Sequence, residues 1–557
     1  MHGAIMKLIS AYARLDIKED RFMKPVTELD FHTLTTEQKI GLLLCANLNH
    51  GPADVENALT MIREHRLGAV WVTTNNRNRD EILQRVRETA DYPILIFCDA
   101  EDGFGDCKIP AAISLSAANA REEYAYAFGR ATSSALAAMG YNVVCNPVLD
   151  RTDQNYPCGG VTRSLSPDKE VAARLGTAVA RGMHDGGTLS VAKHYPSAMK
   201  QPPYDTHMRE GNAADTREDL VNESLYPYRA MMAAGVLDGV MVGHTLLPAI
   251  DPDRTACLSG KVTGILRDCG FDGFYITDGL NMMGVVLKYG NYAPTPMAVG
   301  AGCDLPLSWG IPCREAYGAL LDGYRNGTFT EEQMNASVKR ILEAHHKVTL
   351  LPKPTGVREE DRENIRRLNR ECISSHCAEG VSPAIDPAGK HLFVLVTNGS
   401  ATVSLSEYDA FANDWYRPPV IADRIRELFP NSEVVTHPEH PDLYQNMRLF
   451  RTQQDYEDIV FVTATQTVCF VGREHLTHRT VDMMDALQSA DRIAAHLHFG
   501  NPFVATDAPY VPRVLLGWGS EACIMNTLDI LAGNAAVVGT QPYADLLTFH
   551  KKGDIFY

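Results

Sequence analysis

In the stretch Leu189-Ser190-Val191-Ala192-Lys193-His194-Tyr195-Pro196, an apolar run passes directly into two ionisable side chains. A second stretch has the same form, because Gly273-Phe274-Tyr275-Ile276-Thr277 leads directly to Asp278. Short, nearly continuous apolar runs are typical of strands that are buried on both faces of a parallel sheet. Ionisable groups at the carboxyl ends of such strands are typical of α/β barrels, which place their chemistry there.

Runs of this kind recur between Leu42 and Ser308, separated by longer segments that have the periodicity of helices. They predict eight strands, at residues 42–45, 68–72, 93–98, 142–145, 190–192, 239–242, 274–276 and 303–307. The whole region has the ~250 residues that are usual for a (β/α)8 barrel. We therefore predict an α/β protein with an N-terminal TIM-type barrel.

Capping residues predict where two of the helices begin. Ser166 precedes Pro167, and proline is favoured at the first position of a helix. Thr330 precedes two glutamates, which are favoured in the first helical turn.

A second alternation of strands and helices begins at His391, with strands predicted at residues 391–396, 433–435, 458–462, 492–497 and 514–516. It predicts a smaller α/β sandwich domain that contains a doubly wound sheet. A Pro-rich stretch at residues 351–356 and a charged helical segment at 358–370 separate it from the barrel. The predicted domains are residues 1–350 (TIM-barrel catalytic domain), 351–390 (linker and connecting helix) and 391–557 (C-terminal α/β sandwich).

The composition argues against several classes of function. The formal net charge is −17, and no cluster of Lys and Arg could follow a phosphate backbone, so nucleic acid and anionic membranes are poor partners. No stretch approaches the ~18 apolar residues of a membrane span, and the N-terminus lacks the pattern of a signal peptide. The 13 cysteines are scattered and form no Cys-x-x-Cys pair, which predicts the reducing cytoplasm.

Two carboxylate-containing segments indicate chemistry, although each also has a structural interpretation. Asp278 could attack an anomeric carbon through an oxocarbenium-like transition state, or it could cap the following helix. In Asp205-Thr206-His207, the carboxylate could fix the tautomer of a histidine that donates and accepts protons. The same pair could also be an ordinary feature of a surface loop.

Lys193 is unusual because lysine is rarely placed at the end of a buried strand. It could form a buried ion pair, a Schiff base as in aldolase-like barrels, or hydrogen bonds to sugar hydroxyls. Asp99, which follows the third predicted strand, and Arg163 could share such a binding role.

Together, these segments resemble glycoside hydrolase family 3, and specifically its β-N-acetylglucosaminidase branch. Members carry a Lys-His-Phe-Pro segment, an Asp-x-His dyad about a dozen residues later, and Thr-Asp-x-Leu-x-Met at the nucleophile. The corresponding segments here are Lys193-His194-Tyr195-Pro196, Asp205-Thr206-His207 and Thr277-Asp278-Gly279-Leu280-Asn281-Met282, in the same order. The resemblance covers residues 33 to about 346.

The resemblance implies a role for each matching residue. Asp278 would be the nucleophile, and His207, oriented by Asp205, would be the general acid/base of a retaining mechanism. The residues implied in holding the non-reducing sugar are Asp99, Arg163, Lys193, His194 and, in the family-like Met241-Val242-Gly243-His244, His244. No metal or organic cofactor is implied.

The chain departs from the family pattern in two places. The branch usually continues Gly-His-Gly or Gly-Asp-Gly after Lys-His-Phe-Pro, whereas this chain has Ser197-Ala198-Met199-Lys200-Gln201-Pro202-Pro203. The family often has Gly-Gly-Arg after the residue that matches Asp99, whereas this chain has no arginine there.

The resemblance predicts removal of non-reducing-end β-linked N-acetylglucosamine from small oligosaccharides or other amino-sugar glycosides. Two related activities remain open: a β-glucosidase, and a phosphorylase in which phosphate replaces water. A catalytically silent sugar-binding barrel and a Schiff-base lyase at Lys193 remain as alternatives from other classes. The sequence does not indicate an oligomeric state.

Overall fold

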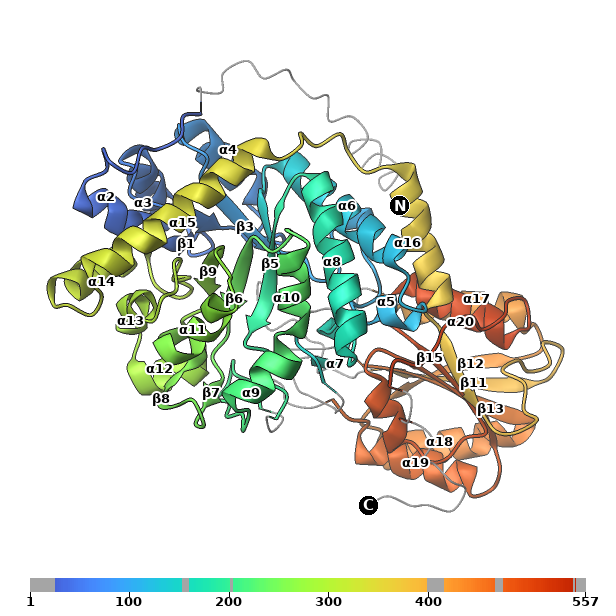
Figure 1. Cartoon of the computed structure of the whole chain (residues 1–557). Coiled ribbons are helices and arrows are strands. Elements are labelled where there is room, and N and C mark those ends of the chain that lie inside the picture. Colours follow the sequence, from blue (N-terminus) through green and yellow to red (C-terminus); the bar gives the residue numbers. More distant parts are fainter. Residues whose placement is uncertain are drawn as a thin grey trace.

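Figure 1 shows the computed structural model, which describes residues 26–152, 160–200, 204–397, 415–465, 474–543 and 546. A parallel sheet in its N-terminal part has the strand order β1-β2-β3-β4-β5-β6-β9. These strands are β1 (Cys45–Asn47), β2 (Ala69–Trp71), β3 (Leu95–Asp99), β4 (Val143–Cys145), β5 (Leu189–Tyr195), β6 (Gly239–Val242) and β9 (Phe274–Thr277). Six of the eight predicted strand positions are confirmed by these elements, and the first predicted strand overlaps β1 only at Cys45.

The eighth predicted strand closes the sheet into a barrel. Leu305 forms a parallel bridge to Ile276 of β9, and Leu307 forms one to Cys45 of β1. Each contact is an isolated bridge and not a continuous ladder, and Pro306, which lies between the two residues, has no N–H to donate. The N-terminal part is therefore a TIM-like barrel, as predicted.

Aromatic side chains fill the barrel interior. The rings of Trp71 on β2 and Phe97 on β3 are stacked, with centroids 6.2 Å apart. Phe97 in turn meets the edge of Phe274, which comes from β9 on the far side of the barrel, at 6.0 Å. All three side chains are buried, so a packed apolar core supports the residues at the carboxyl ends of the strands.

Helices surround the barrel (Figure 1). The longer ones are α3 (Pro52–Arg63), α4 (Arg79–Thr89), α6 (Glu122–Met139), α8 (Lys169–Gly186), α10 (Tyr226–Ala233), α11 (Gly260–Asp268), α14 (Cys313–Arg325) and α15 (Glu331–Leu350). Shorter ones are α2 (Thr36–Leu42), α5 (Ser114–Ala117), α7 (Gly160–Arg163), α9 (Arg217–Asp219), α12 (Met283–Tyr289) and α13 (Pro294–Gly300). A small antiparallel ribbon pairs β7 (Leu246–Leu247) with β8 (Asp251–Thr255).

Two local predictions are wrong. Leu42 ends helix α2 and the strand begins only at Cys45, because a short apolar run can be the buried end of a helix as well as a strand. Helix α8 is capped by Asp168, whose side chain accepts a hydrogen bond from the N–H of Val171. Ser166 instead accepts a hydrogen bond from the N–H of Asp168, in the turn before the helix.

The predicted start of α15 is confirmed. Thr330 and Gln333 form a reciprocal capping box, in which each side chain accepts a hydrogen bond from the backbone N–H of the other residue.

A second sheet has the order β10-β15-β14-β13-β11-β12. Its strands are β10 (Ser374–Cys377), β11 (His391–Thr397), β12 (Glu433–Pro438), β13 (Asp458–Ala464), β14 (Ile493–Phe499) and β15 (Arg513–Gly517), all parallel except β10. Helices α17 (Pro418–Leu428), α18 (Leu443–Thr452), α19 (His478–Gln488) and α20 (Glu521–Leu531) accompany them. This is the predicted second α/β domain. The boundaries at residues 350 and 390 remain a prediction, and β10, which the sequence did not reveal, lies between them.

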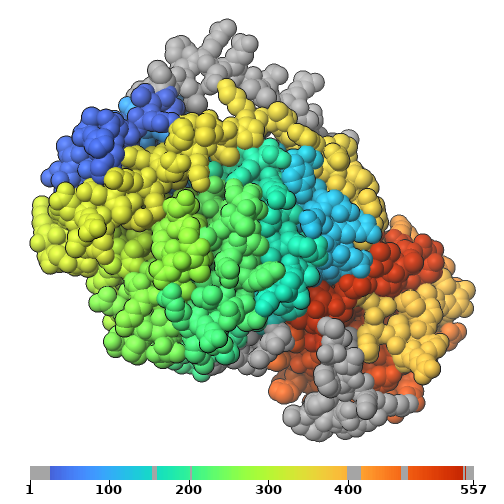
Figure 2. All heavy atoms as spheres, viewed as in Figure 1, coloured from blue at the N-terminus to red at the C-terminus, as the bar shows by residue number. Residues whose placement is uncertain are grey.

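Helix α16 (Glu359–Glu371) connects the two parts, running from α6 of the barrel to α20 of the second domain (Figure 1). Near its start, the Asp361 carboxylate receives two hydrogen bonds from Arg130 of α6, at 2.9 Å from Nε and 2.6 Å from Nη2. Near its end, Ser520 donates to Asn369 at 2.7 Å. Figure 2 shows the second domain, coloured orange to red, packed directly against the helices of the barrel. No helix in the described part of the chain is long and apolar enough to cross a membrane.

We expect Asp361→Ala to lower the free energy of unfolding by about 3 kcal/mol, because the buried Arg130 guanidinium loses its buried carboxylate and keeps only the exposed carboxylate of Glu360, at 3.6 Å. The side chains of Arg130 and Asp361 are only 9% and 1% exposed. Denaturant titration would measure the change. As a control, Asp423→Ala removes an exposed ion pair with Arg426 and should cost less than about 1 kcal/mol. Equal losses in the two variants would contradict the role of the buried pair.

Candidate active site

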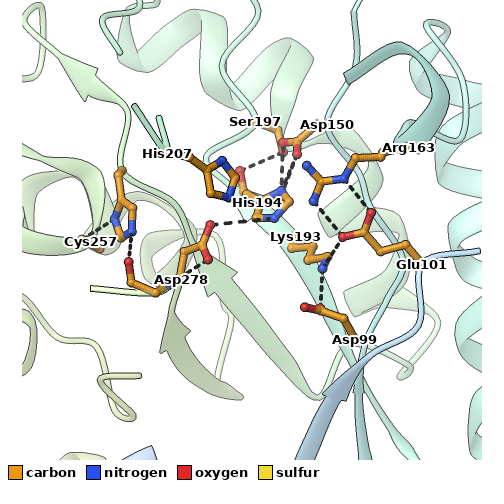
Figure 3. Close-up of polar contacts among 12 residues, drawn as sticks. Asp99, Glu101, Asp150, Arg163, Lys193, His194, Ser197, His207, Cys257 and Asp278 are labelled. Carbon is orange, nitrogen blue, oxygen red and sulfur yellow. Dashed lines mark hydrogen bonds and ion pairs between the residues drawn. The ribbon is translucent and has the colours of Figure 1, made fainter. Parts of the chain in front are cut away.

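The predicted site residues gather at the carboxyl end of the barrel (Figure 3). Asp99 ends β3, Lys193 and His194 lie near the end of β5, and Asp278 directly follows β9. Arg163 ends the short helix α7, and His207 lies in the loop after β5. Because parallel strands end at one edge of the barrel, residues almost 180 positions apart in the chain share one site.

Lys193 forms the centre of an ion-pair cluster. Its ammonium lies 2.6 Å from Asp99 and 2.5 Å from Glu101, and its side chain is only 2% exposed. Arg163 holds the same Glu101 in a bidentate pair, with N–O distances of 2.6 and 2.7 Å. Each buried charge therefore has a partner of opposite sign, as burial requires.

The cluster fixes the protonation of its members. Burial alone would lower the pKa of Lys193, but the carboxylates of Asp99 and Glu101 outweigh it and raise that pKa. Burial would raise the pKa of Glu101, but Arg163 and Lys193 hold it well below its usual range. Lys193 therefore stays an ammonium ion, which is a hydrogen-bond donor and a poor nucleophile, and this argues against the Schiff-base alternative.

Glu101 is a site residue that the sequence analysis missed. It lies two positions after Asp99, in the loop where the family often has Gly-Gly-Arg, and no motif or strand pattern marks it. Its position between Lys193 and Arg163 becomes visible only when β3, β5 and α7 come together.

His194 is held by Asp150, with 2.6 Å between Nδ1 and the carboxylate. The backbone N–H of His194 and the hydroxyl of Ser197 donate to the same carboxylate at 3.1 and 2.9 Å. Burial would raise the pKa of Asp150, but His194 and these hydrogen bonds lower it. The other ring nitrogen, Nε2, lies 4.0 Å from the carboxylate of Asp278, so His194 lies between two carboxylates.

Asp278 occupies the turn between β9 and α12. Its backbone N–H donates to the carbonyl of Val242 at 2.9 Å, and its carboxylate accepts from the N–H of Gly279 at 2.7 Å. Burial would raise the pKa of Asp278, but the neighbouring histidines His194, His244 and His207 lower it to about 2. The carboxylate is therefore ionised at neutral pH, as a nucleophile must be.

His207 and Asp205 form the predicted dyad. Nδ1 of His207 lies 2.7 Å from the Asp205 carboxylate, which also accepts the backbone N–H of His207 at 2.9 Å. Helix α12 supports this loop, because the N–H groups of Met283 and Gly284 donate to the carbonyls of His207 and Thr206, each at 3.2 Å. The loop that carries the dyad is thus attached to the helix that follows Asp278.

His244 lies behind the turn at Asp278. It is buried, with Nε2 3.0 Å from the carbonyl of Gly279 and Nδ1 3.2 Å from the sulfur of Cys257. Burial lowers the pKa of His244. These contacts support the backbone at Gly279, and a substrate-binding role for His244 remains a prediction.

The altered loop after β5 is described in part. The N–H groups of Met199 and Lys200 donate to the carboxylate of Asp215 at 3.0 and 2.7 Å, which anchors the first half of the loop. Residues 201–203, its second half, lie outside the described residues.

An ionised carboxylate beside a His–Asp pair at the carboxyl end of a parallel barrel is an arrangement suited to nucleophilic and acid/base chemistry. The sequence model of the glycosyl hydrolase family 3 N-terminal domain matches residues 35–344. The chain belongs to glycosyl hydrolase family 3 and is a glycosidase.

Individual relatives agree with this assignment. A β-hexosaminidase of Tolumonas auensis is 28% identical over 272 residues, which are 46% of this chain and 79% of the relative. A β-N-acetylglucosaminidase/β-glucosidase of Cellulomonas fimi is 25% identical over 552 residues, 91% of this chain and 93% of the relative. The solved structure of a family 3 β-N-acetylglucosaminidase from Paenibacillus sp. has the same fold, with a TM-score of 0.76, 24% identity, and coverage of 91% of this chain and 98% of that one.

We expect Glu101→Gln to lower kcat/KM by about tenfold or more, because Lys193 and Arg163 lose the charge that positions them. Steady-state kinetics on an aryl glycoside would measure the loss. Asp106→Asn, which changes a carboxylate that is 67% exposed in the same loop and pairs with Arg362, is the control and should have little effect. Similar losses in both variants would indicate a general effect of charge in this loop.

The low pKa of Asp278 predicts an unusual acid limit of activity. The carboxylate should remain ionised as the pH falls below the ordinary aspartate value of 3.8 and become protonated only near 2. With an activated aryl glycoside, which needs no protonation of its leaving group, kcat/KM should therefore not fall with an apparent pKa near 4. Circular dichroism at each pH would show that the protein stays folded. A decline centred near pH 4 in folded protein would contradict this prediction.

Proposed function

We propose that this family 3 glycosidase is a retaining β-N-acetylglucosaminidase that removes non-reducing-end residues from small oligosaccharides. The observation that carries the proposal is the His207–Asp205 dyad on a loop that is attached to the helix following Asp278. A histidine at this place can donate the proton that a carboxylic acid donates in glycosidases with two catalytic carboxyl groups. The name of the Cellulomonas relative supports N-acetylglucosamine as the sugar, and the name of the Tolumonas relative, a β-hexosaminidase, supports an amino sugar.

In the proposed mechanism, the Asp278 carboxylate attacks the anomeric carbon while His207 donates its proton to the departing glycosidic oxygen. The C–O bond to the leaving group breaks, and a covalent glycosyl-enzyme forms. His207 then removes a proton from water, which attacks the same carbon and releases the sugar. Asp205 orients the imidazole ring of His207 and stabilises the charged form of this ring.

The ion-pair cluster supports binding of the sugar in this proposal. The ammonium of Lys193, the carboxylate of Asp99, the guanidinium of Arg163 and Nε2 of His194 offer fixed donors and acceptors next to Asp278. Sugar hydroxyls both donate and accept, so they suit such a mixed set. The proposed chemistry uses no metal or organic cofactor.

We also propose the cytoplasm as the location of this protein. Every cysteine among the described residues is free, and most are buried, as expected for a reducing compartment.

The first test is release of nitrophenol from aryl β-N-acetylglucosaminide and aryl β-glucoside, by the unaltered protein and by Asp278→Ala. We expect cleavage of the acetamido sugar and its loss in the variant. A preference for the glucoside would favour the β-glucosidase alternative. The name of the Cellulomonas relative, which includes both activities, is the reason to test it. A pronounced rate increase with added phosphate, with sugar phosphate as product, would favour the phosphorylase.

His207→Ala tests the acid/base assignment. We expect kcat on substrates with poor leaving groups to fall by about 10²–10⁴-fold, since these need a proton from His207, and glycosylation by activated aryl glycosides to fall far less. Equal losses on both classes of substrate would count against the assignment.

A further inference from the structure

Ser197 has a backbone conformation that is unusual for a serine. Its φ angle is +53°, in the left-handed region that glycine adopts without steric cost and that most other residues avoid. In the family pattern a glycine follows the Lys-His-Phe-Pro segment, whereas this chain has a serine there. Residues held in such a conformation cluster at functional sites, so the contacts of this side chain are informative.

The hydroxyl of Ser197 connects a carboxylate to a phenol. It lies 2.9 Å from the carboxylate of Asp150, 2.9 Å from the hydroxyl of Tyr228 and 3.3 Å from the carbonyl of His194. A serine hydroxyl has one proton, and an ionised carboxylate is the strongest acceptor of the three, so Ser197 donates to Asp150. Tyr228 must then donate to Ser197. Burial raises the pKa of Tyr228, so its phenol keeps the proton that this bond needs.

Tyr228 is a fixed anchor for this chain of hydrogen bonds. It lies on α10 with 0% exposure, and the edge of its ring meets the ring of Tyr195 on β5, with centroids 6.1 Å apart. From Tyr228 the chain runs through Ser197 to Asp150, whose other contact is Nδ1 of His194 at 2.6 Å. Each group limits the rotation of the next one.

We propose that Ser197 is a positioning residue of the active site. Its hydroxyl, held by Tyr228, fixes the carboxylate of Asp150. That carboxylate then holds the imidazole of His194 with Nε2 facing Asp278. The inference rests on the proposed function for the roles of His194 and Asp278, and it gives a reason for a side chain at a position where the backbone favours glycine.

The first test is Ser197→Gly, which removes the hydroxyl and suits the left-handed backbone. We expect kcat/KM on an aryl glycoside to fall by about tenfold, because the imidazole of His194 is no longer held in place. The midpoint of thermal unfolding should change little, since relief of the backbone offsets the lost hydrogen bond. The substrate is whichever of the aryl β-N-acetylglucosaminide and β-glucoside the unaltered protein cleaves faster, so the test does not depend on the sugar.

The pH profile separates positioning from a structural role. Burial raises the pKa of Asp150, whereas His194 and the hydrogen bond from Ser197 lower it. Without the hydroxyl this pKa rises, so Asp150 takes up its proton at a higher pH as the pH falls. The acid limb of kcat/KM should therefore lie at higher pH in Ser197→Gly than in the unaltered protein. The titratable side chains that face Asp150 in the described structure are His194 of β5 and Tyr228 of α10, and Tyr228 stays neutral over this range.

Tyr228→Phe tests the other end of the chain, because it removes the phenol hydroxyl and keeps the buried ring. We expect a smaller loss of kcat/KM than in Ser197→Gly. The double variant should be no worse than Ser197→Gly alone, because the phenol acts through the serine hydroxyl. Losses that multiply in the double variant would overturn the inference.

Ala120→Gly is the matched control for glycine at a left-handed position. Ala120 has a φ angle of +50° and lies between α5 and α6, so this variant relaxes the backbone without removing a hydroxyl. It should leave kcat/KM and the acid limb as they are. If Ser197→Gly also leaves both unchanged while Asp278→Ala is inactive, the inference alone is overturned. Activity that survives in Asp278→Ala would instead refute the proposed function, so the two failures are distinguishable.

Discussion

The site depends on the burial of one positive charge at the end of β5. The Lys193 ammonium is almost inaccessible to water and is stable there only because Asp99 and Glu101 lie within 2.6 Å. Arg163 balances the second carboxylate, so two cations and two anions form a neutral cluster. This cluster connects β3, β5 and α7, so the local geometry of the site depends on how these three elements pack together.

In the part of the site around Asp278, carboxylates likewise position nitrogen-containing side chains, here histidines. Asp150 orients His194 and Asp205 orients His207. In each histidine, Nδ1 is in contact with a buried or partly buried carboxylate. The histidines in turn lower the pKa of Asp278. The His194 and His207 rings beside the proposed nucleophile are thus themselves positioned by other carboxylates.

The C-terminal part of the chain contacts the helix that bears Arg163. The hydroxyl of Tyr543 donates to the carbonyl of Val161 in α7, the helix that ends at Arg163, at 3.1 Å. The ring of Tyr543 packs on Phe503 of the second domain, with centroids 5.0 Å apart. Together with α16, which joins the two parts, this contact means that the C-terminal residues help to hold the helix that bears Arg163.

Sequence alone determined the barrel strands and the ionisable residues at their ends, because buried parallel strands are short apolar runs and catalytic groups follow them directly. It could not separate the end of α2 from β1, since both are apolar, nor reveal β10, whose sequence Ser374-Ser375-His376-Cys377 lacks a strand pattern. Only the tertiary structure showed that Glu101 lies between Lys193 and Arg163 and that His244 supports the backbone at Gly279. Such pairings join residues far apart in the chain, and periodicity carries no information about them.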